Sequence, residues 1–148
     1  MAIIAHHSKG EDVAHLARVH RPALSDLRIV ATRAAGWILT DLGLEVDPLG
    51  AAADGGVAQI GALVLDGAVD AVVVLRDPMT AGAMIGNLVS LCDACEVPLA
   101  TNRVTAEILL RDVARRSWAD RGRISHPSVL SAYRFPWDPP VRRIPEAE

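Results

Sequence analysis

Short apolar runs alternate along the chain with segments in which apolar residues recur every three or four positions. The runs predict strands, and the wider spacing predicts amphipathic helices between them. Five strands are expected at 1–5, 28–32, 44–47, 71–75 and 99–101, and five helices at about 10–20, 34–42, 57–65, 81–95 and 105–113. This alternation predicts a single three-layer α/β domain, with a parallel, doubly wound sheet of the Rossmann-like or flavodoxin-like kind and helices on both faces.

The valine-rich run at 71–75 has no polar alternation, which predicts burial on both faces and a central place in the sheet. Beyond residue 115 the pattern ends, and the five prolines of 117–148 deny that segment regular structure. We therefore expect a domain over 1–115 and an irregular, Pro-rich extension over 116–148. The aromatic cluster of the extension is expected to dock onto the parent domain or a neighbouring subunit. Its members are Tyr133, Phe135 and Trp137.

Length and composition fit one such domain, because 148 residues with 51% hydrophobic content can bury a core. A net charge of -3 without a basic block argues against a nucleic-acid partner. No apolar stretch approaches the roughly 20 residues that cross a bilayer, and no signal-peptide pattern opens the chain. We expect a soluble, cytoplasmic protein with no membrane partner.

Cys92 and Cys95 have the spacing of a redox pair or of half a zinc site. They fall late in a predicted helix, without a second such pair and without a nearby histidine. We therefore interpret them as small residues that face the core. His6 and His7 are adjacent and lack partner ligands at suitable spacing, so no metal site is predicted.

Ligands of doubly wound sheets bind outside the carboxyl ends of the strands, where helix N-termini, glycine-rich turns and basic side chains favour an anion. The residues after the strands therefore predict a site for a small phosphorylated or carboxylated molecule. Taken singly, each has a plainer role: Thr32 or Asn102 as a helix cap, and Lys9 as a solvated charge. The candidates are His6, Lys9, Thr32, Arg33, Asp54, Gly55, Gly56, Asp77 and Asn102.

Several short motifs stand in a fixed order between residue 3 and about residue 113. They are Ala5-His6, Pro22, Ala31-Thr32, Gly55-Gly56, Gln59-Ile60-Gly61-Ala62-Leu63, Val69-Asp70, Asp77-Pro78, Val97-Pro98-Leu99-Ala100-Thr101-Asn102 and Thr105-Ala106. Together they resemble methylglyoxal synthase and the wider methylglyoxal-synthase-like domain family. The resemblance implies a lyase that removes phosphate from dihydroxyacetone phosphate without a cofactor, in a compact homo-oligomer that is commonly a hexamer.

The resemblance also assigns roles to single residues. His6 stands where the family has an active-site histidine, and Asp77 matches an aspartate near the ligand. Thr32 matches the first residue of the family's phosphate-binding Thr-Gly-Thr-Thr turn. The rest of that turn reads Arg33-Ala34-Ala35 here, which removes two hydroxyl donors and a glycine, although Arg33 offers a bidentate contact of its own.

Other positions depart from the family. Its catalytic aspartate after Gly-Gly is Val57 here, and Asp54, three residues earlier, is the candidate replacement. Its phosphate-contacting lysine falls on Gly10, with Lys9 one residue before. A Pro-His-Asp-Pro-Asp segment supplies a histidine and an aspartate in the family, whereas the shorter segment 80–87 has neither.

Two functions of different classes fit these residues. Phosphate elimination needs a base beside the carbonyl, a group that stabilises the enediolate and a cradle for phosphate. His6 as electrophile or acid, with Asp54 or Asp77, predicts a divergent lyase or related isomerase acting on dihydroxyacetone phosphate or a similar small anionic carbonyl compound. The lost base and phosphate turn instead favour a non-catalytic regulatory domain that binds a small anion, as in the resembling allosteric domain of carbamoyl phosphate synthetase.

Overall fold

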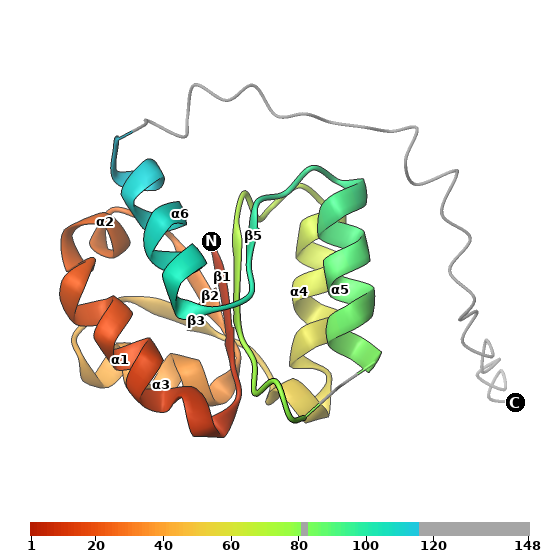
Figure 1. Ribbon diagram of the computed structural model, residues 1–148, viewed down its shortest axis with the longest axis horizontal. Coiled ribbons are helices and arrows are strands. Elements are labelled where there is room, and N and C mark those ends of the chain that lie inside the picture. Colours follow the sequence, from red (N-terminus) through yellow and green to blue (C-terminus); the bar gives the residue numbers. More distant parts are fainter. Residues whose placement is uncertain (81–82, 116–148) are drawn as a thin grey trace, which may run out of the picture.

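The computed structural model describes residues 1–80 and 83–115, which form a parallel sheet between two groups of helices (Figure 1). The sheet has the strand order β3-β2-β1-β4-β5, and each neighbouring pair is parallel. Its strands are β1 (Ala2–Ala5), β2 (Ile29–Ala31), β3 (Val46–Pro48), β4 (Val72–Leu75) and β5 (Leu99–Ala100). The five predicted strands are confirmed, with ends displaced by one or two residues.

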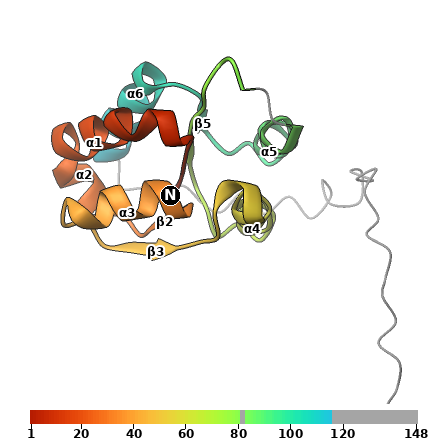
Figure 2. The same ribbon diagram turned by 90° about the horizontal axis from the view of Figure 1, so that it is seen from below.

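Helices cover both faces, as predicted for a doubly wound sheet. One face carries α1, α2, α3 and α6, and the other carries α4 and α5 (Figure 2). The helices are α1 (Gly10–Val19), α2 (Arg21–Ser25), α3 (Arg33–Asp41), α4 (Gly56–Leu65), α5 (Ala83–Ala94) and α6 (Arg103–Arg115). Two 3-10 turns, η1 (His7–Lys9) and η2 (Ala52–Asp54), precede α1 and α4.

Alternating strand side chains divide the interior into two cores. Ile3 and Leu75 belong to the core beneath α1, α3 and α6, while Ile4 and Val74 belong to the core beneath α4 and α5. Burial of such a side chain stabilises the fold by about 1.5–3 kcal/mol. All four residues of β4 are buried, which confirms the central place predicted for the valine-rich run.

The predicted number of helices, five, is wrong because α2 was not expected. A single helix was predicted over about 10–20, with Pro22 at its exit. Instead α1 ends at Val19, and Pro22 lies in the first turn of α2. Proline fits there because first-turn N–H groups have no intrahelical partner and its φ is preset. The expected helix start at 81 and the extension 116–148, with its aromatic cluster, lie outside the described residues.

Both cysteines pack as predicted. Cys92 is fully buried in the core beneath α5, and Cys95 is half-buried against the same core, each as a free thiol. Burial raises the pKa of Cys92 to about 11, so this thiol stays protonated at neutral pH.

Among the described residues, no helix has the length and apolar character needed to cross a membrane.

His20 is a buried polar side chain at the junction of α1 and α2. Its Nε2 has no hydrogen-bond partner among the described residues. Burial lowers the pKa of His20 below 6.5; the negative charge of Glu107 opposes this shift, and Arg111 and His15 add to it. The folded protein therefore favours the neutral ring.

We expect His20 to make the protein less stable in mild acid. Above the unfolded pKa, near 6.5, both states are neutral; below it the unfolded chain binds the proton first, so stability falls until the lower folded pKa is reached. His20→Leu should therefore show a smaller loss of unfolding free energy between about pH 7 and about pH 5 than the wild type. Urea denaturation at each pH measures this, with His7→Gln as an exposed control. An unchanged pH dependence in His20→Leu would refute the assignment.

Candidate functional site

The carboxyl ends of β1, β2 and β4 lie side by side because β1 pairs with both neighbours. The ladder continues one residue past the strands. The His6 amide donates to the Leu75 carbonyl at 2.9 Å, and the Thr32 amide donates to the Ile3 carbonyl at 3.1 Å. The sheet itself therefore fixes the backbones of His6 and Thr32 at the edge where ligands of such folds bind.

The structure brings His6 and Asp77 together at this edge. Asp77 Oδ2 lies 4.0 Å from His6 Nδ1, and the two side chains are 26% and 28% exposed. The other carboxylate oxygen, Oδ1, accepts the N–H of Met79 at 2.9 Å, which orients Asp77 in the turn after β4. Asp77 thus places an oriented negative charge beside the imidazole ring.

The His6 ring also caps the 3-10 turn η1. Its Nδ1 accepts the Ser8 N–H at 3.3 Å and lies 2.8 Å from Ser8 Oγ. Ser8 was not among the residues predicted from the sequence. The sequence does hold a signal for it, because Ser8 comes two residues after a candidate histidine. A side chain at the start of a helical turn can accept a hydrogen bond from the amide two residues later.

Thr32 lies at the N-terminus of α3 and is 1% exposed. It does not act as the side-chain cap that was its plainer expected role, and its Oγ1 has no hydrogen-bond partner in the described part of the chain. A buried hydroxyl without a partner is uncommon in proteins and costs about 1–3 kcal/mol. Its position at a helix N-terminus is suited to an anion, whose oxygens would accept a hydrogen bond from the hydroxyl.

Arg33 begins α3 with an exposed side chain that forms no ion pair among residues 1–80 and 83–115. Its amide donates to the Gly50 carbonyl at 3.3 Å, so one of the free N–H groups of the first turn is used internally. The N–H groups of Ala34 and Ala35 are the remaining first-turn donors. The loop after β3 therefore touches the N-terminus of α3 directly.

That loop is held closed by hydrogen bonds that its backbone amides donate. The Gly50 amide donates to Gln59 Oε1 at 2.9 Å, and the Gly56 amide donates to the Ala51 carbonyl at 2.9 Å. Gly55 has φ +90°, which favours glycine. A Cβ on Gly56 would lie 2.3 Å from the Gly50 carbonyl oxygen. Loop geometry explains both glycines, and their contact with a ligand stays a prediction.

Val57, where the resemblance to the family leads us to expect a catalytic aspartate, is part of the core. Val57 is 4% exposed and packs with the apolar residues beneath α4. Asp54, the candidate replacement, is exposed in η2, and its carboxylate forms no hydrogen bond or ion pair among the described residues. No hydrogen bond or ion pair joins Asp54 to His6 within that part of the chain. Asp54 is thus an available carboxylate on the loop that borders α3.

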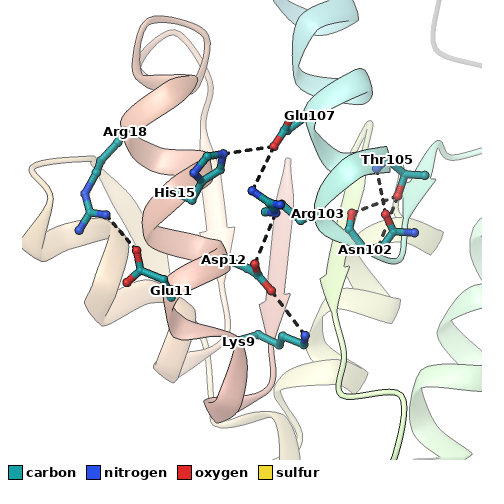
Figure 3. Close-up of polar contacts among 9 residues, drawn as sticks. All are labelled: Lys9, Glu11, Asp12, His15, Arg18, Asn102, Arg103, Thr105 and Glu107. Atoms are coloured by element: carbon teal, nitrogen blue, oxygen red, sulfur yellow. Dashed lines mark hydrogen bonds and ion pairs between the residues drawn. The ribbon is translucent and has the colours of Figure 1, made fainter.

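Lys9 belongs to a chain of ion pairs between α1 and α6 (Figure 3). Its Nζ lies 3.5 Å from Asp12 Oδ2, and Asp12 Oδ1 lies 3.5 Å from Arg103 Nε. Glu107 continues the chain, 3.8 Å from Arg103 and 3.2 Å from His15. The charge of Lys9 is therefore partly compensated before any ligand binds. Asp12 was not predicted, although its place three residues after Lys9 on a helix permits the pair.

Asn102 caps α6, which is the structural role that was expected for it as the alternative to ligand binding. Its Oδ1 accepts the Thr105 N–H at 3.0 Å, and the Asn102 amide donates in return to Thr105 Oγ1 at 3.4 Å (Figure 3). Such reciprocal bonds satisfy first-turn amides that would otherwise lack partners. A ligand contact by Asn102 stays a prediction.

Known proteins with a similar sequence or fold are methylglyoxal synthases. No family model matches the chain. Over 124 residues it is 44% identical to the methylglyoxal synthase of Burkholderia mallei strain SAVP1, covering 81% of this chain and 95% of that protein. It is 45% identical over 120 residues to the methylglyoxal synthase of Burkholderia thailandensis, covering 78% and 92%. The crystal structure of methylglyoxal synthase from Elizabethkingia anophelis NUHP1 matches with a TM-score of 0.68 and 28% identity over 74% of each chain.

Gly56→Ala should destabilise the protein, because the new Cβ would overlap backbone oxygens of Gly50 and Ala51. Opening the loop to relieve this overlap costs about 1–3 kcal/mol of unfolding free energy, measurable by urea denaturation. Gly86→Ala, on α5 with open space around the new Cβ, should instead stabilise by up to about 1 kcal/mol. Equal stabilities for the two variants would show that the loop is not closed as described.

Proposed function

Because the chain belongs to the methylglyoxal synthase family, we propose that it is a carbon–oxygen lyase. Its substrate is dihydroxyacetone phosphate or a similar small anionic carbonyl compound. The observation that carries the proposal is the arrangement of His6, Asp77 and the N-terminus of α3 along one edge of the sheet. A related isomerase would use the same proton transfers without loss of phosphate.

The phosphate end of the substrate binds at the N-terminus of α3. The Thr32 hydroxyl, which has no partner in the described residues, and the first-turn amides of Ala34 and Ala35 supply donors, and the helix dipole favours the negative charge. The exposed Arg33 can add a bidentate contact. This arginine offsets the two hydroxyl groups that alanines replace in the turn.

The carbonyl end lies toward His6, which donates a hydrogen bond to the oxygen. Asp54 is assigned as the base, because its carboxylate forms no hydrogen bond or ion pair among the described residues, whereas Asp77 is held by the Met79 amide. The base takes a proton from the carbon beside the carbonyl, and the electron pair forms an enediolate. The enediolate expels phosphate as the carbon–oxygen bond breaks, and the enol takes up a proton to give methylglyoxal. No electrons are gained or lost overall, so no cofactor is required.

One observation favours the second candidate, a regulatory domain that binds a small anion without turnover. Val57 is buried in the core at the position where a catalytic aspartate was expected. A positioned base typically contributes about 10²–10⁴ in rate, so its loss without replacement would leave a binding site only. The phosphate cradle at α3 serves either function.

The remaining expectations are unchanged. A homo-oligomer, hexameric by resemblance to the family, stays a prediction, and so does a cytoplasmic location. Lys9 as a phosphate ligand also stays a prediction; it would require the lysine to leave Asp12, at 3.5 Å.

Incubation with dihydroxyacetone phosphate should release inorganic phosphate and methylglyoxal in equal amounts. His6→Ala and Asp54→Asn should each lower kcat by about 10²–10⁴, because one loses the electrophile and the other the base. Ser90→Ala is the control and should be unaffected, because the Ser90 hydroxyl donates to the Gly86 carbonyl on its own helix, α5, and has no other partner in the part of the chain that the structure describes. A wild type that binds phosphate but releases none would overturn the lyase and support the regulatory domain. Undiminished turnover in Asp54→Asn would refute the assigned base.

A further inference from the structure

We propose that Ser8 is a positioning residue that fixes the tautomer of His6, so that the neutral ring carries its proton on Nε2 and points an N–H donor at the substrate. The chemical part of this inference rests on the lyase function proposed above. The structural part, which nitrogen carries the proton, concerns the ligand-free protein and stands on the contacts of the ring.

The backbone amide of Ser8 determines which nitrogen of His6 carries the proton, because an amide N–H can only donate. The Ser8 nitrogen lies 3.3 Å from His6 Nδ1 with hydrogen-bond geometry. A neutral imidazole has one donor nitrogen and one acceptor nitrogen. Since Nδ1 must accept from the Ser8 amide, the proton of the neutral ring lies on Nε2.

The Ser8 hydroxyl strengthens this preference. Its Oγ lies 2.8 Å from the same Nδ1, the shorter of the two contacts. With the backbone amide already donating there, the hydroxyl donates as well, and its rotation allows it to do so. Two donors of the same residue thus point at Nδ1. No water molecule or flexible side chain is needed to supply them.

The carboxylate of Asp77 favours the other tautomer, with the proton on Nδ1, but its effect on the neutral ring is weaker than that of Ser8. Its Oδ2 is an acceptor that would favour a proton on Nδ1, but it lies 4.0 Å away, beyond hydrogen-bond distance. The Ser8 contacts, at 2.8 and 3.3 Å, are within that distance. Asp77 therefore acts on His6 through its charge, while Ser8 sets the proton's place.

The tautomer divides the chemical work between residues. An Nε2–H group donates a hydrogen bond to the carbonyl oxygen and stabilises the enediolate as it forms, without transferring its proton. Neutral imidazole is able to polarise a carbonyl in this way. The same nitrogen cannot accept the proton from carbon at that moment. The base must therefore be another group, which agrees with the assignment of Asp54.

The test is ¹⁵N NMR of the His6 ring in the full-length, ligand-free protein at a pH where the ring is neutral. The wild type should show a protonated Nε2 and an unprotonated Nδ1. Ser8→Ala keeps only the backbone donor, so a measurable fraction of the Nδ1–H form should appear. Ser8→Thr restores the hydroxyl and should restore the wild-type spectrum, and Ser90→Ala should leave it unchanged. A wild-type ring protonated on Nδ1, or a Ser8→Ala spectrum identical to that of the wild type, would overturn the proposal.

Kinetics with dihydroxyacetone phosphate separate this role from a merely structural one. Ser8→Ala should lower kcat about three- to tenfold with little change in KM, and Ser8→Thr should recover it, because the hydrogen bond acts on the reacting group rather than on binding. An unchanged kcat, or a loss confined to KM, contradicts the chemical role. If the wild type shows the Nε2–H form but no turnover, the tautomer assignment stands and the lyase function fails.

Discussion

Everything at the candidate site depends on the parallel pairing of β1 with β2 on one side and β4 on the other. Because of this pairing, the carboxyl ends of three strands lie at one edge of the sheet. The backbone hydrogen bonds between the strands continue one residue further, to the amides of His6 and Thr32. Neither residue needs a long loop to reach its place. The burial of β1 and β4 on both faces makes the edge rigid, since moving either strand would expose two cores at once.

The proposed site has several donors at the end assigned to phosphate, and it lacks the expected base at the end assigned to the carbonyl. The start of α3 brings together a buried hydroxyl that has no partner among residues 1–80 and 83–115, first-turn amides and an exposed arginine. By contrast, the position of the expected base is filled by Val57, which is buried in the core beneath α4. Catalysis then requires a carboxylate from elsewhere, and Asp54 is on the loop whose Gly50 carbonyl already accepts the Arg33 amide. An Nε2–H donor on His6 is consistent with a mechanism in which His6 donates a hydrogen bond and a separate carboxylate acts as the base.

The sequence was sufficient for the sheet and for the edge on which the candidates gather, because apolar runs and helical spacing report burial directly. It was insufficient for α2, since a proline that ends one helix and a proline that begins another look alike. It also missed Ser8 and Asp12, whose partners are set by a 3-10 turn and by the packing of α1 against α6. Likewise, spacing alone could not separate a capping role of Asn102 from a binding role, which needed the Thr105 contacts.

The most direct measurement is a titration of the protein with inorganic phosphate, followed by amide chemical shifts. If the sheet edge binds a phosphorylated ligand, saturable shifts should concentrate in residues 32–36 and 50–56, with smaller ones at His6, and Thr32→Val should weaken them. Shifts that are absent, that never saturate, or that centre on α6 and its arginines would contradict a phosphate site at the N-terminus of α3.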